Sequence, residues 1–400
     1  MTMEAAKRAI DASAESAFAV LGKAKELEAL GREVIHLEIG EPDFVTPLHI
    51  REAAIEALRR GETHYTPTPG LPELREAIAW KTKQDLGIDL NWKENVLVTI
   101  GAKEGIFAAL ASILEPGDEV IFPDPGYPSY EGVTRFLDGR PVPLELKEGN
   151  SFRMTSEEVS DLVTSRTKAI VLNSPENPTG SVLRREDVRG IAEIAKDNGI
   201  YVISDEIYKY IIYDGVRHYS PAEFDPELHN TIVLDGFSKG FAMTGWRLGY
   251  MIVPKHLTPF TTKILNLMTS CVSMFVQRGG IAALKGPMES VQEAVRIYRD
   301  RRDVLIEEIS KVRGVSMVKP LGAFYGFVNV KDLLSKTNMS SVKLATLILE
   351  KYGVAVLHGT AMGRNGEGYI RISYANSIEN IRKGVRIVGK AIEDTYRNVK

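Results

Sequence analysis

The chain has 400 residues, and its 50 Lys and Arg against 53 Asp and Glu give a formal net charge of −3. This near-neutral balance argues against a dedicated nucleic-acid binder and against a protein held on membranes by basic residues. The single cysteine, Cys271, excludes an intrachain disulfide framework and any metal or iron–sulfur site that needs several cysteines, and we expect no metal.

No targeting or membrane segment is predicted. Apolar runs stay well short of the roughly 18 residues of a membrane span. Near the start, the only uninterrupted apolar stretch is 17–21, and the acidic residues Glu4, Asp11 and Glu15 disagree with both a signal peptide and a transit peptide. We therefore expect a cytoplasmic protein that binds neither membrane nor nucleic acid.

The first half of the chain changes from a helical arm to an alternating pattern. Residues 4–30 mix alanine with charge and predict a helix, and 34–39 predict a short strand. From about residue 50 to 285, segments of helical spacing separate short apolar runs at 95–100, 119–122, 168–172, 200–204, 231–234 and 248–253. Runs too short for helices, alternating with helical segments, indicate βαβ units and a mostly parallel sheet.

Helical faces mark the later part of the chain. Val188, Ile191 and Ala195 form one apolar face that Gly199 closes. A longer face with 3-4-3-4 spacing comprises Ile378, Ile381, Val385, Val388 and Ile392. We expect an α/β protein with two domains. The large one (49–285) has a mostly parallel sheet sandwiched by helices, and both termini (1–48 and 286–400) build a smaller α+β domain.

Polar residues follow five of the predicted strands, at the edge where open α/β sheets bind ligands. They lie in the segments 101–105, 123–128, 173–180, 205–208 and 236–240, with Arg247 beyond the last of them. Together they supply an amine, a carboxylate, an amide, aromatic rings and an anion site. An aldehyde cofactor with a phosphate and a basic ring nitrogen requires such a set.

With these motifs the chain resembles the fold-type I, pyridoxal-phosphate-dependent aminotransferases of classes I and II. The resemblance runs from Gly40-Glu41-Pro42-Asp43-Phe44 to Arg371-Ile372-Ser373-Tyr374. Its most specific pieces are Asn177-Pro178-Thr179-Gly180, Ser204-Asp205-Glu206-Ile207-Tyr208, and Ser238-Lys239 through Met243-Thr244-Gly245-Trp246-Arg247. It implies pyridoxal 5'-phosphate as the cofactor, amino acids and 2-oxo acids as small-molecule partners, and a homodimer.

The resemblance implies catalytic roles for Lys239, Asp205 and Tyr208, and a contact with the cofactor ring for Asn177. Lys239 is the Schiff-base lysine, and its aromatic neighbours are a setting that lowers the pKa of an amine. Asp205 pairs with the ring N–H, although an aspartate at such a position also caps helices. Asn177 and Tyr208 match positions that hydrogen-bond the ring hydroxyl; otherwise they are a turn residue and a core residue.

Further positions match the contacts of the cofactor's phosphate and ring. Ser238 and Arg247 match phosphate contacts, and Ala102 and Lys103 begin a helix whose backbone N–H groups suit the same anion. Tyr127 matches the aromatic residue that stacks on the ring, with an ordinary core tyrosine as the alternative.

Tyr65 matches a tyrosine that reaches the phosphate in the neighbouring subunit, so it implies a homodimer with shared active sites.

Substrate contacts are implied at four positions. Arg371 matches the clamp for the α-carboxylate, which a planar guanidinium grips with two parallel hydrogen bonds. Gly40 and Asn177 match positions lining that carboxylate. Lys103 matches a lysine of the prokaryotic aspartate aminotransferases that meets the distal carboxylate of a dicarboxylic substrate, with a merely solvated lysine as the alternative. The expected reaction is transamination between L-aspartate and 2-oxoglutarate, and alanine, aromatic amino acids and LL-diaminopimelate are alternative donors.

Some positions depart from the family's commonest pattern. Gly236 stands where some relatives have a serine that touches the phosphate, so we expect that contact to be missing. Glu176 replaces the usual asparagine, a change expected to be harmless. His358 and Met362 replace residues of the pocket wall, and His358 is expected to be structural.

One competing class is an α/β-hydrolase, because Gly236-Phe237-Ser238-Lys239-Gly240 fits the nucleophile-elbow pattern with Ser238 as the nucleophile. That hypothesis requires a long helix directly after the serine. The glycines at 245 and 249 and the apolar run at 248–253 favour another strand instead, so we consider the hydrolase hypothesis weak. The residues 201–206 fit a Walker B strand, but no Walker A loop exists to accompany it.

Overall fold

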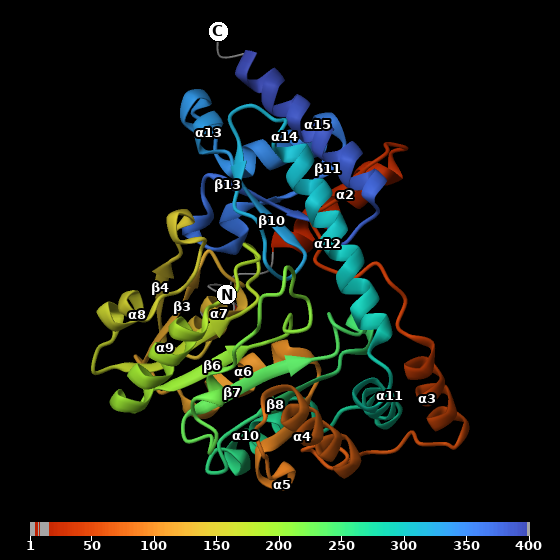
Figure 1. Ribbon diagram of the computed structural model, residues 1–400, viewed down its shortest axis with the longest axis vertical. Helices are drawn as coiled ribbons and strands as arrows, with labels where there is room; N and C mark the ends of the chain where they lie inside the picture. The colour runs from red at the N-terminus through yellow and green to blue at the C-terminus, as the bar shows by residue number, and fades with distance from the viewer. Residues whose placement is uncertain (1–4, 7, 9–15, 398–400) are drawn as a thin grey trace, which may run out of the picture.

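A seven-stranded sheet forms the centre of the computed structural model, which describes residues 5, 6, 8 and 16–397 (Figure 1). Its strand order is β2-β8-β7-β6-β5-β3-β4. The strands are β2 (Val96–Thr99), β3 (Glu119–Asp124), β4 (Arg140–Glu145), β5 (Thr167–Asn173), β6 (Tyr201–Asp205), β7 (Thr231–Gly236) and β8 (Gly249–Ile252). β8 runs antiparallel to both β2 and β7, and the other neighbours are parallel. The predicted mostly parallel sheet is confirmed.

Helices cover both faces of this sheet, because successive strand residues point to opposite sides. Leu97 packs with α6 (Gly101–Ile113) and α10 (Thr258–Thr269), whereas its neighbours Val96 and Val98 pack with α4 (Pro72–Leu86) and α11 (Met274–Lys285). On this second face, α8 (Ser156–Leu162) and α9 (Arg185–Asn198) cover the half that contains β3, β5 and β6. The remaining helices of the large domain are α3 (Leu48–Arg59), α5 (Trp92–Asn95) and α7 (Ser129–Phe136).

The smaller domain contains segments from both parts of the chain, as predicted. Its antiparallel sheet has the order β12-β13-β10-β9, formed by β9 (Ser316–Met317), β10 (Tyr325–Asn329), β12 (Leu357–His358) and β13 (Tyr369–Ser373). The early strand β1 (Ile35–His36) pairs in parallel with the late strand β11 (Val354–Ala355). Its helices are α2 (Ser16–Ala29), α12 (Glu289–Ile309), α13 (Lys331–Thr337), α14 (Ser341–Tyr352) and α15 (Ile378–Arg397).

The predicted helical faces are confirmed with one difference. Val188, Ile191 and Ala195 of α9 are buried, and Gly199 ends that helix in the left-handed conformation at φ 66°. In α15 the predicted residues from Ile381 onward are buried, but Ile378 is 42% exposed because the helix begins there, at its outer end. The arm expected over 4–30 is a helix from Ser16 to Ala29; 4, 7 and 9–15 lie outside the described residues.

Strand β4 was not predicted, because Pro141 and Pro143 interrupt its sequence. Proline lacks an N–H and is tolerated mainly at the edge of a sheet. The position of β4 meets this condition, since it pairs with β3 alone at the end of the strand order.

The two domains meet beyond the carboxyl ends of the parallel strands, and α12 runs from beside α11 into the smaller domain (Figure 1). Short 3₁₀ turns occur at η1 (Glu148–Asn150), η2 (Pro221–Glu223), η3 (Thr244–Trp246), η4 (Gly359–Met362) and η5 (Arg364–Gly366). Within the described part of the chain, no helix has both the length and the apolar character needed to cross a membrane.

Candidate active site

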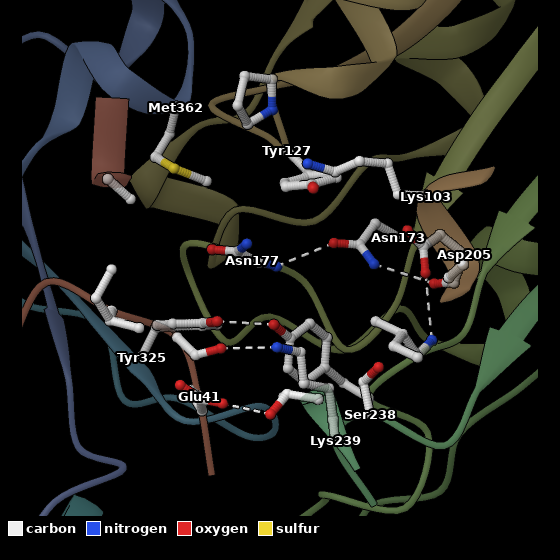
Figure 2. Close-up of a pocket in the computed structure, with 18 of the residues that line it drawn as sticks. Glu41, Lys103, Tyr127, Asn173, Asn177, Asp205, Ser238, Lys239, Tyr325 and Met362 are labelled. Carbon is white, nitrogen blue, oxygen red and sulfur yellow. Dashed lines mark hydrogen bonds between the residues drawn. The ribbon is translucent and has the colours of Figure 1, made fainter. Parts of the chain in front are cut away.

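A pocket of about 490 Å³ lies between the carboxyl ends of the large sheet and the smaller domain (Figure 2). It brings together all the site residues predicted from the sequence except one. Those that line it are Gly40, Ala102, Lys103, Tyr127, Asn177, Asp205, Tyr208, Ser238, Lys239, Arg247 and Arg371. The exception is Tyr65, which is 90% exposed and does not belong to the lining residues of the described chain.

Lys239 follows β7 and reaches across to the smaller domain. Its Nζ donates a hydrogen bond of 2.7 Å to the carbonyl oxygen of Gly40 (Figure 2) and lies 5.9 Å from the ring centroid of Phe324. Gly40 must be a glycine here, because a Cβ atom would lie 1.9 Å from the hydroxyl oxygen of Tyr325. The amine is therefore held at the boundary of the two domains.

Asp205 ends β6 as a buried carboxylate, with 4% of its surface exposed. Its Oδ2 accepts a hydrogen bond of 2.8 Å from the hydroxyl of Tyr130, and its Oδ1 accepts from the backbone N–H of Ile207. Burial raises the pKa of Asp205 to about 6, although these two hydrogen bonds lower the pKa. A turn rather than a helix follows Asp205, so the helix-cap interpretation is wrong.

Tyr208 faces the smaller domain. Its hydroxyl lies 2.7 Å from the hydroxyl of Tyr325, and the two rings meet edge to face. Burial raises the pKa of Tyr208 well above its usual value, so the phenol keeps its proton and can donate it in a hydrogen bond.

Arg371 lies within β13 and is 4% exposed. Nη1 donates to Asn177 Oδ1 at 2.9 Å, Nη2 donates to the carbonyl oxygen of Glu38 at 2.5 Å, and the guanidinium lies 4.4 Å from the Tyr325 ring centroid. Nε is buried without a hydrogen-bond partner in the described chain. A buried donor in this state costs about 1–3 kcal/mol, which an acidic ligand in the pocket would recover.

The start of α6 forms a close contact with Arg247. At Gly101, where φ is 73°, a Cβ atom would lie 2.6 Å from Nη2 of Arg247. Gly249 is equally restricted, since its Cβ atom would lie 2.7 Å from the backbone nitrogen of Ala102. The first N–H groups of a helix have no acceptor inside the helix, so these N–H groups, Arg247 and the buried Ser238 together suit an anion.

Lys103 and Tyr127 lie opposite Lys239 in the pocket, in the upper part of Figure 2. Nζ of Lys103 is 5.7 Å from the ring centroid of Tyr127, a cation–π distance. Tyr127 in turn packs edge to face on Tyr130. The prediction that Lys103 lies at the start of a helix is confirmed, and its side chain lines the pocket.

The positions that depart from the family pattern have physical explanations. Gly236 is closely packed, because a Cβ atom would lie 3.0 Å from the Leu248 carbonyl oxygen, a tight contact. His358 bonds to Thr360 and does not line the pocket, whereas Met362 lines it and places its sulfur 3.8 Å from Nη1 of Arg371.

The nucleophile-elbow hypothesis fails on local structure. Ser238 is followed by turns and the short η3, not by a long helix.

Some residues of the site were missed by sequence reasoning. Tyr130 holds Asp205, and its position three residues after Tyr127 in a predicted helical segment was the available signal. Asn173 accepts from the backbone N–H of Asn177 and donates to the carbonyl oxygen of Asp205. Tyr325 carries no signal in its local sequence, because its role depends on a contact with Tyr208 that is distant along the chain.

Comparisons with known proteins agree with this geometry. The family model for aminotransferase class I and II matches residues 32–388. An aspartate aminotransferase of Pyrococcus horikoshii is 44% identical over 90% of this chain and 91% of its own length. An aromatic-amino-acid aminotransferase of Thermococcus litoralis is 39% identical over 90% of this chain and 92% of its own. The solved structure of the Thermus thermophilus aspartate aminotransferase with maleate superposes with a TM-score of 0.92 at 37% identity, covering 98% of this chain and all (100%) of the other.

Proposed function

Because the chain belongs to the class I and II aminotransferases, and is therefore an aminotransferase, we propose that it transfers the amino group of L-aspartate to 2-oxoglutarate with pyridoxal 5'-phosphate as cofactor. The observation that carries this proposal is one pocket lined by a lysine amine, a buried carboxylate and a buried arginine whose Nε has no hydrogen-bond partner among the described residues.

The residues of the pocket fit this cofactor. Asp205 is a buried carboxylate that can pair with a pyridine N–H, and Lys239 supplies the amine that reacts with an aldehyde. Arg247 lies so close to Gly101 that a Cβ atom at this position would clash with the guanidinium. This close approach supports a compact phosphate site formed by Arg247, Ser238 and the start of α6.

The ring of the cofactor would have its own contacts in this arrangement. Tyr127 would stack on the ring, while Asn177 and Tyr208 would bond its hydroxyl. When bound, the cofactor supplies an aldehyde that links covalently to an amino group and a protonated ring that takes up the electron pair of the Cα–H bond.

The chain's own residues then have distinct tasks. Arg371 binds the α-carboxylate through its guanidinium and so fixes the orientation of the substrate Cα. With the cofactor bound, Nζ of Lys239 would take the proton from the substrate Cα and deliver it to the cofactor's aldehyde carbon, not back to Cα. Tyr130 keeps Asp205 in place through their hydrogen bond of 2.8 Å, and Tyr325 holds Tyr208 in the same way.

Substrate choice rests on Lys103. Its ammonium group lines the pocket beside Tyr127, where a second carboxylate of aspartate or 2-oxoglutarate would be its ionic partner. Alanine and aromatic donors lack that carboxylate, and this difference supports aspartate over them.

We further propose a homodimer with shared sites, in which Tyr65 of the partner subunit reaches the phosphate. The 90% exposure of Tyr65 and its absence from the residues that line the pocket in the described chain support this proposal. Exposed apolar side chains on α10, Phe260 and Leu267, also suit a covered face. The cytoplasmic location stays a prediction.

A panel of amino donors tests the function. Yellow holoenzyme is mixed with 2-oxoglutarate and, separately, with aspartate, alanine, phenylalanine or LL-diaminopimelate, and glutamate formation is measured. Aspartate is expected to give the highest kcat/KM. If another donor exceeds aspartate, the substrate assignment is wrong; if no donor forms glutamate, transamination with 2-oxoglutarate is wrong.

A further inference from the structure

Glu176 is a buried carboxyl group that the proposed reaction does not use. It lies in the loop between β5 and α9 and is 3% exposed. Its Oε2 accepts hydrogen bonds from both the backbone N–H and the hydroxyl of Thr179, the first at 3.0 Å. Its Oε1 is buried and has no hydrogen-bond partner among the described residues.

A small cavity of about 10 Å³ adjoins this carboxyl group and shares the lining residue Asn173 with the main pocket. Glu176, Ser181 and Asn173 supply its polar lining, and apolar side chains such as Phe152 and Leu172 supply the rest. The hydroxyl oxygen of Ser181 is also buried and unpartnered in the described chain. Two residues of the cavity lining therefore carry an oxygen atom without a partner in the described part of the chain, and the cavity is close to the lower size limit for one water molecule.

The electrostatic surroundings favour the neutral acid. The carboxyl group of Asp124, at the end of β3, interacts electrostatically with Glu176, and so does Tyr130 of α7. Both are acids, and neither supplies a positive charge. Burial and the nearby Asp124 carboxylate together raise the pKa of Glu176 to about 8, despite the hydrogen bonds from Thr179. A charged carboxylate in this place would be costly.

The loop around Glu176 holds part of the substrate site. Its backbone N–H donates to the Ser181 carbonyl at 2.9 Å, and its carbonyl accepts from Gly180 at 2.9 Å. The next residue, Asn177, accepts the hydrogen bond from Nη1 of Arg371 at 2.9 Å. A change in the shape of this loop would therefore move the amide that orients Arg371.

We propose that Glu176 is a positioning residue that acts as a neutral carboxylic acid, its Oε1 hydroxyl linked to Ser181 through one water in the cavity, and so keeps Asn177 against Arg371. A single proton then satisfies Oε1 without burying a charge. The role of Arg371 as the carboxylate clamp comes from the proposed function, whereas the protonation of Glu176 does not depend on it.

Infrared spectroscopy tests the protonation independently of activity. The wild-type protein is expected to show a buried carboxylic-acid C=O band at pH 7 that disappears with a midpoint near pH 8. Asp124 and Asp205, with pKa values of about 6, are mostly ionised in this range. Glu176→Gln removes the band, and Ser181→Ala keeps it at a shifted frequency. A wild-type spectrum without a band that titrates in this range would overturn the proposal, whether or not the variants fold.

The dependence of KM on pH tests the positioning role. If only the neutral acid holds Asn177 correctly, KM for aspartate in the wild type rises about tenfold between pH 7 and pH 9, because the competent fraction falls by that factor. Glu176→Gln, which mimics the neutral acid, is expected to lack this rise while kcat follows the wild-type profile. The same rise in both proteins would overturn the positioning role. Failure of the donor panel would refute the proposed function and leave the infrared result untouched.

Discussion

The amine of Lys239 lies 2.7 Å from the carbonyl oxygen of Gly40, so a residue that follows β7 is held by a residue of the smaller domain. Gly40 keeps this position because Tyr325 leaves no room for a side chain on it. Tyr325 also bonds Tyr208 and stacks on Arg371. Gly40, Tyr208 and Arg371, which are proposed to hold the lysine amine, the cofactor ring and the substrate α-carboxylate, therefore all contact Tyr325 where the two domains meet.

Lys239→Ala is expected to abolish turnover and leave the cofactor bound without a covalent link, because one amine serves as covalent anchor and proton carrier. Transamination assays and absorption spectra measure both effects. Borohydride treatment of the wild type, followed by peptide mapping, should label Lys239, and Lys103→Ala serves as a control that keeps the label. A label on any other lysine contradicts the assignment.

Asp205→Ala is expected to leave a folded protein whose turnover falls by several orders of magnitude, since the protonated ring loses its counter-ion. Circular dichroism checks the fold, and kcat with aspartate checks the chemistry. Tyr130→Phe is the matched control: it removes one hydrogen bond to the carboxylate and should reduce turnover far less. Near-normal turnover in Asp205→Ala would mean that the carboxylate does not serve the ring.

In the cofactor-free protein, the dependence of the unfolding free energy on pH should reveal the raised pKa of the buried Asp205. Its folded pKa of about 6 exceeds the unfolded value of about 3.9, so its stabilising contribution is complete below pH 4 and is lost as pH rises to 6. Asn does not titrate. The unfolding free energy of Asp205→Asn relative to wild type should therefore increase by about 2–3 kcal/mol from pH 4 to pH 7. Chemical denaturation at several pH values measures it, and a constant difference would contradict a raised pKa.

The shared site predicts complementation between two inactive variants. Each proposed site takes Lys239 from one subunit and Tyr65 from the other. A mixed dimer of Tyr65→Ala and Lys239→Ala therefore contains one site with neither substitution and one site with both. Partial activity should return on mixing and subunit exchange, up to about a quarter of wild type if half the dimers are hybrid. Sedimentation checks the dimer, and Asp205→Ala mixed with Lys239→Ala is the control, because every site of that hybrid keeps one lesion. A monomer, or no recovery after verified exchange, would argue against shared sites.

Much of the fold and of the site could be predicted because short stretches of sequence determine the strands and the residues that follow them. The strands and the residues at their ends follow from short apolar runs and from motifs such as Asn177 to Gly180. Contacts between distant segments could not be predicted in this way. Tyr325 meets Tyr208 because the smaller domain folds against the large sheet, whereas Glu38 offers a backbone carbonyl to Arg371 because early and late segments of the chain meet inside the smaller domain. The domain limits at 48/49 and 285/286 stay a prediction.

Lys103 provides the sharpest test of substrate choice. Its Nζ lines the pocket 5.7 Å from the Tyr127 ring centroid, opposite Lys239, where a distal carboxylate would reach it. A charge-assisted hydrogen bond contributes about 1.5–3 kcal/mol, which corresponds to roughly 10–150-fold in kcat/KM. Lys103→Met keeps much of the side chain's volume and removes the charge. It should lower kcat/KM for aspartate and 2-oxoglutarate by about that factor and change alanine little.

The comparison of aspartate with alanine isolates the distal contact, since both donors share the α-carboxylate site at Arg371. Lys103→Arg is the matched control, because it keeps the positive charge and should retain more of the preference for aspartate. Steady-state kinetics with both donors give the ratio directly. An equal loss for aspartate and alanine would mean that Lys103 acts through the cofactor at the start of α6, and the proposed basis of dicarboxylate preference would then be wrong.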